Sequence, residues 1–99
     1  MRQVVWLRRA TRSLSSILEQ ISEGSPQAAK GLGLAIQKHV ALLREQPHMG
    51  RPGRVLGTRE LVVHKNYLVP YRIRDERIEI LHVLHSRQQW PSTLDPENK

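Results

Sequence analysis

The first half of the chain shows the hydrophobic spacing of amphipathic helices. In its first segment the apolar residues stand three and four positions apart, at Ala10, Leu14, Ile17, Leu18 and Ile21. This spacing places their side chains along one side of a helix. We therefore predict a helix over Ala10–Glu23, which ends at Gly24 because glycine favours helix termination.

A second helix is predicted to begin directly after the first. Ser25 suits the N-cap and Pro26 suits the first helical position. The apolar residues that follow keep the helical spacing, at Ala29, Leu32, Ile36, Val40 and Leu43. A helix over Ser25–Gln46 fits them, and the pair forms an αα-hairpin with a very short connection. Because Gly31 and Gly33 weaken a helix, we expect them where the first helix comes close.

The last third of the chain alternates apolar and polar residues with the period of β-strands. It predicts three strands joined by tight turns, over Arg59–His64, Tyr67–Arg74 and Arg77–His85. A shorter β-prone run, Val4–Leu7, predicts a strand before the first helix. Pro70 has no N–H to donate to a ladder, so its strand should be bulged or partly unpaired at that point.

The third predicted strand, Arg77–His85, carries apolar residues on both faces, which indicates a central and well-covered position. Strict alternation places Ile78, Ile80 and Leu84 on one face and Leu81 and Val83 on the other. Cationic residues run through all three strands, and we expect the sheet to display them on one face. The segment His48–Gly57 contains three glycines and a proline, so it is interpreted as the connection from helix to sheet.

Length and charge narrow the classes of function. A chain of 99 residues makes one domain, predicted over residues 1–91, with a polar tail at residues 92–99. The formal charge is +7, with twelve arginines and four lysines among the cations. The planar guanidinium of arginine suits carboxylates and phosphates, so the expected partner is an acidic protein, nucleic acid, or both. The simpler alternative is that the charges only solvate the protein.

Composition disfavours several chemistries. The absence of cysteine leaves no disulfide framework and no thiolate chemistry, which fits the cytoplasm. No apolar run is long enough for a membrane span, and the apolar stretch near the N-terminus is too short for a signal peptide. His82 and His85 stand three positions apart on one predicted strand, hence on opposite faces, so they should not share a metal ion. We predict neither a metal site nor a cofactor.

The residues with chemical potential lie in the last third of the chain. His85 falls at the end of a predicted strand, where a histidine can transfer protons, although a local hydrogen-bonding role is the simpler interpretation. The predicted binding set is Arg59, Lys65, Arg72, Arg74, Arg87 and Trp90. Alternatively, these arginines form a solvated face with Glu60 and Glu79 as cross-strand partners. Trp90 either stacks on a base or covers the edge of the core.

A series of short motifs runs through the chain in a definite order. A strand and a helical hairpin precede a Pro-x-x-Gly break, which is followed by Gly-Thr-Arg-Glu-Leu-Val-Val, Tyr-x-Val-x-Tyr-Arg and Ile-Glu-Ile-Leu-x-Val-x-His-x-Arg-x-x-Trp-Pro. This order resembles that of the RelE/ParE superfamily of bacterial type II toxins. The resemblance extends from Val4 to Pro91 and is carried by the order and spacing of the motifs together.

The resemblance implies an α+β fold. In that fold an N-terminal strand and an antiparallel two-helix hairpin pack on a curved, mostly antiparallel sheet of four to five strands. It also implies a cognate antitoxin, whose C-terminal segment wraps the toxin and neutralises it. Such segments are often acidic, which agrees with the basic composition of this chain.

Two activities occur in the superfamily. RelE-like members cleave mRNA in the ribosomal A site, and that activity would assign catalytic roles to His85, Arg59 and Arg87 in a metal-independent endoribonuclease. ParE-like members poison DNA gyrase and are not known as nucleases. Leu68 stands where the RelE pattern places a catalytic arginine, and the long helical hairpin and the C-terminal motif resemble the ParE branch. We therefore expect ParE-like action on gyrase, with RelE-like mRNA cleavage and a nontoxic nucleic-acid-binding module as alternatives.

Overall fold

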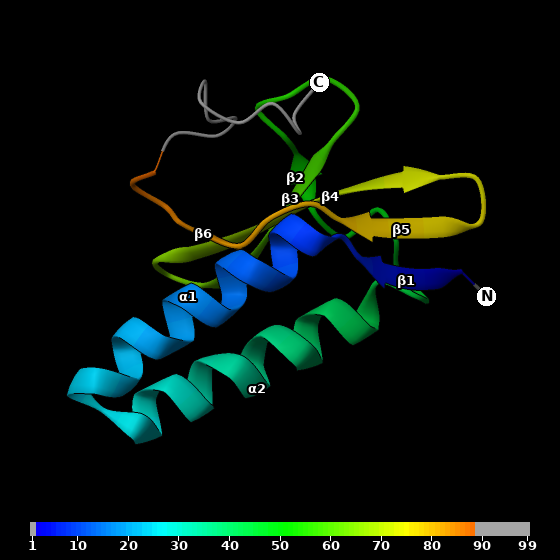
Figure 1. Cartoon of the computed structure of the whole chain (residues 1–99). Helices are drawn as coiled ribbons and strands as arrows, with labels where there is room; N and C mark the ends of the chain where they lie inside the picture. The colour runs from blue at the N-terminus through cyan, green and yellow to red at the C-terminus, as the bar shows by residue number, and fades with distance from the viewer. Residues whose placement is uncertain (1, 89–99) are drawn as a thin grey trace.

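The computed structural model describes residues 2–88, which form two helices and six strands (Figure 1). Along the chain these are β1 (Gln3–Trp6), α1 (Arg8–Gly24), α2 (Pro26–Leu42), β2 (Arg51–Pro52), β3 (Arg59–His64), β4 (Tyr67–Arg74), β5 (Arg77–Ile80) and β6 (Leu84–His85). The two helices lie side by side and share one core with the sheet, which confirms the predicted α+β architecture. Trp90 and the predicted tail at residues 92–99 lie outside the described residues.

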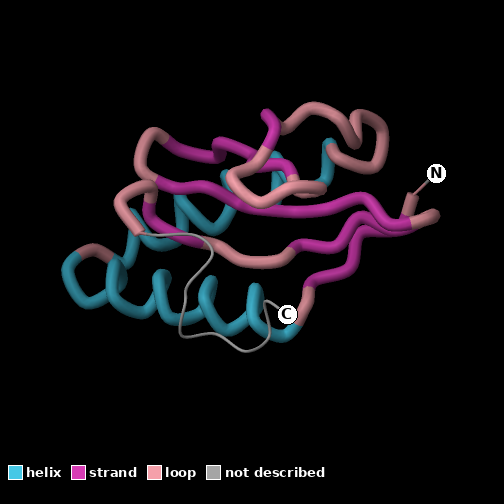
Figure 2. Tube along the Cα trace, turned by 90° about the horizontal axis from the view of Figure 1, so that it is seen from above, coloured by secondary structure: helices cyan, strands magenta, loops and turns pink. Residues whose placement is uncertain are grey.

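The sheet combines strands from both ends of the chain (Figure 2). Its order is β1-β5-β4-β3-β2, and β6 pairs with β4 beyond the end of β5. β1 runs parallel to β5, and the other pairs are antiparallel, as predicted for most of the sheet. With the two-residue strands β2 and β6, the described residues form six strands, against the four or five that were expected. The central strand is β4 rather than the segment Arg77–His85, because β4 pairs with β3 on one side and with β5 and β6 on the other.

The helical hairpin forms as predicted, and a single residue, Ser25, joins its helices. The Ser25 hydroxyl accepts a hydrogen bond from the N–H of Ala28 at 3.1 Å, and Pro26 stands at the start of α2. α2 ends at Leu42, four residues before the predicted Gln46. The chain tightens there into short turns before the next proline, because a residue that precedes proline disfavours the α-conformation.

Only one of the two glycines in α2 lies against the neighbouring helix. A Cβ atom at Gly33 would lie 3.6 Å from Cδ1 of Leu18, which is ordinary van der Waals contact. No atom lies within 4 Å of the corresponding position at Gly31. The prediction of a close helix approach is therefore right for Gly33 and wrong for Gly31.

The main core lies between the helices and one face of the sheet. Its buried residues are Ala10, Leu32, Ile36, Val40, Leu43, Leu61, Val63, Val69, Tyr71, Ile78, Ile80 and Val83. The apolar stripe of α1 packs against them through Leu14, Ile17, Leu18 and Ile21, which are partly buried. A smaller cluster of Leu68, Leu81 and Leu84 lies on the other face of the sheet, covered by Leu7 and Val55. Burial of apolar surface on both faces holds the central strands in place.

The predicted strand over Arg77–His85 is interrupted in its middle, which corrects the sequence interpretation. Tyr71 lies opposite Ile80, and Leu68 lies opposite Leu84. A span of three residues along β4 therefore faces a span of four residues along the opposite segment. One extra residue is accommodated between β5 and β6. An insertion of this kind is a bulge, which reverses the alternation of side chains beyond it.

The interruption lies next to Pro70, where irregular pairing was predicted. The carbonyl of Pro70 accepts the N–H of Leu81 at 2.9 Å. In an antiparallel pair the N–H and C=O of one residue point the same way, so the N–H that proline lacks would also face the segment of Leu81. A regular ladder cannot continue past that point. Beyond the bulge, Val83 joins the core under the helices and Leu84 joins the cluster on the other face, the reverse of the predicted assignment.

Helix α1 supplies a hydrogen-bonding group to the interrupted segment. The Oγ atom of Ser13 accepts the N–H of Val83 at 3.0 Å and lies 3.0 Å from Nδ1 of His82. The Ser13 hydroxyl donates its proton to the carbonyl of Ala10, so Nδ1 of His82 is the donor in this arrangement. Burial, together with the positive charge of Arg9, lowers the pKa of His82 to about 4. The His82 ring is therefore neutral near pH 7.

We predict that Ser13→Ala lowers the free energy of unfolding by about 1–2 kcal/mol, because the N–H of Val83 loses its acceptor in a partly buried place. Urea denaturation would measure the loss. Ser16→Ala is the matched control, because Ser16 is exposed on the same helix. That control should be neutral or slightly stabilising, since alanine is the better helix former. Equal losses in the two variants would contradict the role of Ser13.

A second prediction concerns the pH dependence of stability. The pKa of His82 is about 4 in the folded chain against its usual 6.5, so the unfolded chain takes up this proton first as the pH falls. The contribution of the neutral ring is therefore present above about pH 6.5 and is lost between there and pH 4. Melting temperatures from pH 7.5 to 4.5 should fall less steeply for His82→Gln than for the wild type. Parallel curves for the two proteins would refute the assignment.

Candidate functional site

The cationic residues of the strands are divided between the two faces of the sheet, which corrects the prediction that one face displays them. Arg59 pairs with Tyr71, a core residue, so both lie on the face that the helices cover. Arg72 and Arg74 alternate with Tyr71 along β4 and therefore lie on the opposite face. We call this opposite face, which also carries Glu60 and Glu79, the open face.

Arg59 anchors the segment between α2 and β2. Its guanidinium donates to the carbonyl of Gly50 at 2.7 Å and to that of His48 at 3.2 Å. The Tyr71 hydroxyl binds the same segment, accepting the N–H of Gly50 at 2.9 Å and donating to the carbonyl of Pro47 at 2.7 Å. Burial raises the pKa of Tyr71, while the Gly50 hydrogen bond and the charge of Arg59 act in the opposite direction. A Cβ atom at Gly50 would lie 2.7 Å from the Tyr71 ring, so only glycine fits there.

One carboxylate cluster on the open face joins β4 and β5. Glu79 is only 3% exposed, and Arg72, its cross-strand neighbour, donates Nε–H to it at 2.6 Å. Arg77, two residues away on the same strand, donates to the other carboxylate oxygen at 2.5 Å. The hydrogen bond from Arg72 is the main reason why the pKa of Glu79 lies below its usual value, with burial opposing it and Arg77 adding to it. This is the cross-strand pairing that was the simpler alternative for these arginines.

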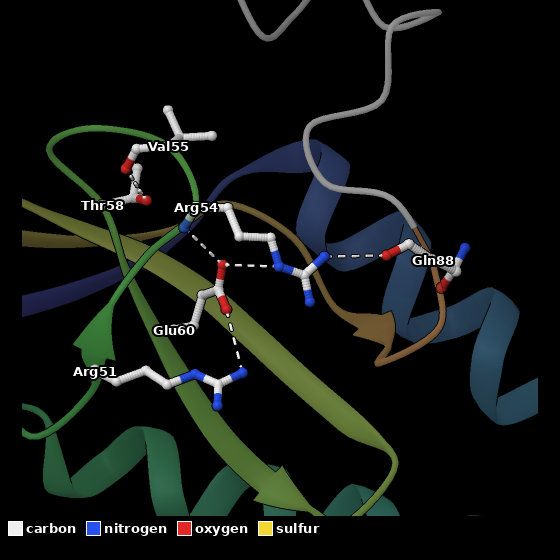
Figure 3. Close-up of polar contacts among 6 residues, drawn as sticks. All are labelled: Arg51, Arg54, Val55, Thr58, Glu60 and Gln88. Carbon is white, nitrogen blue, oxygen red and sulfur yellow. Dashed lines mark hydrogen bonds and ion pairs between the residues drawn. The ribbon is translucent and has the colours of Figure 1, made fainter.

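A second carboxylate cluster joins β3 to the segment before it (Figure 3). Glu60 is 2% exposed, and its Oε2 accepts the backbone N–H of Arg54 at 3.0 Å. The Nε atom of Arg54 lies 3.6 Å from the same oxygen, and Nη2 of Arg51 lies 3.5 Å from Oε1. Two buried carboxylates thus orient four arginines on the open face. The arginines of these pairs are 34–57% exposed, so solvent screening makes each pair weaker than a fully buried ion pair.

The sequence interpretation missed Arg51 and Arg54. Both lie in His48–Gly57, which was interpreted only as a connection. The signal that pointed to them was Glu60, an acidic residue between Arg59 and the apolar run Leu61–Val63. A buried carboxylate needs a cationic partner or several hydrogen-bond donors. Arg59 alternates to the opposite face, so the nearest cations that remain before Glu60 in sequence are Arg54 and Arg51, ahead of the strand. Two predicted residues, Lys65 and Arg74, are exposed and take part in neither carboxylate cluster.

His85 is held by local contacts at the end of β6. Its Nδ1 accepts the backbone N–H of Arg87 at 3.1 Å, and its ring lies edge-on to Tyr67 with centroids 5.2 Å apart. The N–H of Ser86 donates to the carbonyl of Asn66 at 2.8 Å, which ties this turn to the β3–β4 turn. Because Nδ1 acts as an acceptor, the proton of the neutral ring sits on Nε2. The lone pair that a general base would use is already engaged.

The three residues proposed for RNA cleavage do not meet at one place. His85 lies opposite Tyr67, and Arg59 lies opposite Tyr71, four residues further along β4. At roughly 3.3 Å per residue, the two backbones are about 13 Å apart along the strand. Arg59 is also tethered toward Gly50, on the β2 side of the sheet. Arg87 is exposed two residues beyond His85, so only these two of the three are neighbours.

Strand β1 leaves one edge of the sheet unpaired within the described residues. Gln3 and Leu7 donate their N–H groups toward the β5 side. In a parallel pair the intervening residues point the other way, so the backbone groups of Val4 and Trp6 face the free edge. The side chains of Val4 and Trp6 also line a groove with Val40 and Ala41 of α2 and with two polar neighbours.

Within residues 2–88, no three histidine, cysteine, aspartate or glutamate side chains come close enough to hold a metal ion together. The argument from opposite faces does not apply to His82 and His85, because the strand is interrupted between them. Neither of the two described helices is long and apolar enough to cross a membrane.

Comparison with known proteins points to one family. Residues 4–90 match the family described as ParE toxin of type II toxin-antitoxin system, parDE. The Y4kP protein of Sinorhizobium fredii is 43% identical over 94 residues, which cover 94% of this chain and 97% of that protein. Toxin RelE2 of Caulobacter vibrioides is 35% identical over 86 residues, which cover 87% of this chain and 97% of that protein.

A solved structure agrees with this assignment. The structure described as the chromosomal ParDE TA system from P. aeruginosa contains a chain that superimposes with a TM-score of 0.75. The two chains are 26% identical, and the match covers 86% of this chain and 96% of the other. Fold, family match and sequence relatives thus confirm the predicted RelE/ParE superfamily. The chain belongs to the ParE toxin family of type II toxin–antitoxin systems.

Proposed function

We propose that this protein is a cytoplasmic ParE-like toxin that arrests bacterial growth by inhibiting DNA gyrase. The family match over residues 4–90 is the observation that carries the proposal. A type II toxin of this family has a cognate antitoxin, and we propose that the antitoxin neutralises it through an acidic C-terminal segment. The proposed contacts with gyrase are Arg87, which is exposed, and Trp90 just beyond it.

The geometry of the RNA-cleavage candidates supports gyrase over mRNA as the target. Charge that develops on a scissile phosphate must be stabilised by groups that converge on it. Arg59 and His85 stand about 13 Å apart along β4, and Arg59 is engaged by two carbonyl groups. The Nδ1 lone pair of His85 is engaged by Arg87. A group acts as a general base only where its lone pair reaches the proton that it removes.

Two features of the sheet suit the binding of the antitoxin. The open face carries five arginines against two buried glutamates, so it attracts an acidic segment. The free edge of β1 offers backbone donors and acceptors to an extended segment, and the adjoining groove takes apolar side chains. Lys65 and Arg74 stand outside the carboxylate clusters, so a partner can engage them without breaking a buried ion pair.

We predict that Arg74→Glu weakens antitoxin binding roughly tenfold, mainly by slowing association, because steering by complementary charge acts on the encounter rate. Surface plasmon resonance at several salt concentrations would measure the effect, which should shrink as salt rises. Arg12→Glu, a charge reversal at an exposed position of α1, is the matched control and should change the rate little. Reversal at Arg72 is unsuitable, because it would place two carboxylates together at Glu79. Equal losses of affinity for the variants at Arg74 and Arg12 would show that the antitoxin does not bind through the sheet.

The target prediction separates the two activities of the superfamily. The wild-type protein, expressed without its antitoxin, should stop growth and inhibit supercoiling by purified DNA gyrase. Primer extension on translating ribosomes should show no codon-phased cuts for the wild type or for His85→Ala. If the protein instead cleaves mRNA, His85→Ala should lower cleavage by about 10²–10⁴, the usual contribution of a general acid or base.

Each outcome of this comparison favours one reading. Gyrase inhibition without mRNA cuts supports the proposed function. Cuts that vanish in His85→Ala would replace it with RelE-like mRNA cleavage. Unimpaired growth, with neither activity, would favour the nontoxic nucleic-acid-binding module.

A further inference from the structure

The end of the described chain is fastened to the open face by one arginine (Figure 3). The Nη1 atom of Arg54 donates to the carbonyl of Gln88 at 3.2 Å, across 34 residues of sequence. The same arginine is held at its base, where its backbone N–H donates to Oε2 of Glu60 at 3.0 Å and its Nε lies 3.6 Å from that oxygen. Arg54 therefore connects a buried carboxylate with the point where the C-terminal segment begins.

Glu60 orients Arg54 before any partner arrives. The Glu60 side chain is 2% exposed, so it cannot itself touch a macromolecule that binds the surface. Its carboxylate engages both the backbone and the side chain of Arg54, which restricts the rotamers of a long and otherwise flexible residue. Figure 3 shows Arg51 at the other carboxylate oxygen, whereas Arg54 extends to Gln88. Arg51 and Arg54 thus share one carboxylate but differ in what they hold beyond it.

The backbone N–H and the side-chain oxygen of Gln88 are both engaged locally, which helps to hold its carbonyl toward Arg54. The N–H of Gln88 donates to the carbonyl of His85 at 2.9 Å, and its side-chain Oε1 accepts the N–H of His85 at 2.7 Å. These two contacts close a turn at the end of β6. The turn and Arg54 together set the direction of the chain as it passes Gln88.

We propose that Arg54, oriented by Glu60, is a positioning residue that fixes the path of the chain at Gln88 for target binding. The inference rests on the proposed function, in which the neighbours Arg87 and Trp90 contact gyrase. Arg54 need not touch the target for this role. A segment whose start is already fixed loses less conformational entropy on binding, so its affinity is higher than that of a loose segment.

Limited trypsin digestion tests the positioning step without any target. Cleavage after Arg87 requires local opening of the turn that Arg54 holds. Arg54→Gln should release the fragment that ends at Arg87 about tenfold faster than the wild type, as expected for loss of a hydrogen bond from a charged group. Arg51→Gln is the matched control, because it also removes one cationic partner of Glu60, and its rate should stay within about twofold of wild type. Glu60→Gln, which removes the charge that orients Arg54, should also accelerate cleavage.

Gyrase inhibition tests the consequence for function. Arg54→Gln should raise the half-inhibitory concentration in a supercoiling assay about tenfold, whereas Arg51→Gln should change it less than twofold. Circular dichroism melts of both variants check that they fold. If Arg54→Gln does not fold, Arg54→Lys replaces it, because lysine keeps a cation near Glu60 but lacks the guanidinium that bridges to Gln88.

Two results would overturn the proposal. Equal rates of cleavage for the Arg54 and Arg51 variants would show that Arg54 does not fix the turn. Faster cleavage of the Arg54 variant with unchanged gyrase inhibition would show that the path at Gln88 does not matter for the target. If the wild type fails to inhibit gyrase, the proposed function falls, while the digestion assay still decides whether Arg54 positions the chain.

Discussion

The missing N–H of Pro70 is the constraint on which the C-terminal third of the structure depends. Its carbonyl points toward the chain that carries Leu81, so its absent donor points there as well. The facing segment, between β5 and β6, therefore contains one extra residue. The N–H of Val83 in that segment donates to the hydroxyl of Ser13. Pairing then resumes in β6 with the two faces exchanged. The positions of His85 and of the turn after it follow from this interruption and not from regular alternation.

Buried carboxylates determine how the positive charge of this chain can be used. The formal charge of +7 counts all twelve arginines alike, but four of them are oriented by Glu60 and Glu79, and Arg59 is engaged by two carbonyl groups. Such clusters contribute little net stability against apolar replacements, yet they fix the geometry of the groups that they contain. A partner of the open face therefore meets arginines whose directions are already set.

The repetitive elements were predictable because periodicity is a local signal. The bounds of β3 and β4 match the prediction, and the helices differ from it by a few residues at their ends. The bulge was only half predictable, since Pro70 indicates irregular pairing but the acceptor for Val83 comes from a helix distant in sequence. The separation of Arg59 from His85 could be predicted from the sequence, because the two tight turns pair both strands with β4. The links from Arg54 to Glu60 and Gln88 could not be predicted, because they depend on how a glycine-rich connection folds over the sheet.

The distribution of contacts also bears on what kind of activity the scaffold suits. Catalysis needs groups that converge on one reacting centre with lone pairs or protons available, whereas binding needs only groups that are accessible and well oriented. Here the histidine and arginine singled out for catalysis are engaged in separate local contacts at different places along β4. The arginines of the open face are partly exposed and held in fixed directions. These contacts support the proposed function, in which the protein acts by docking on larger partners through the surface of its sheet.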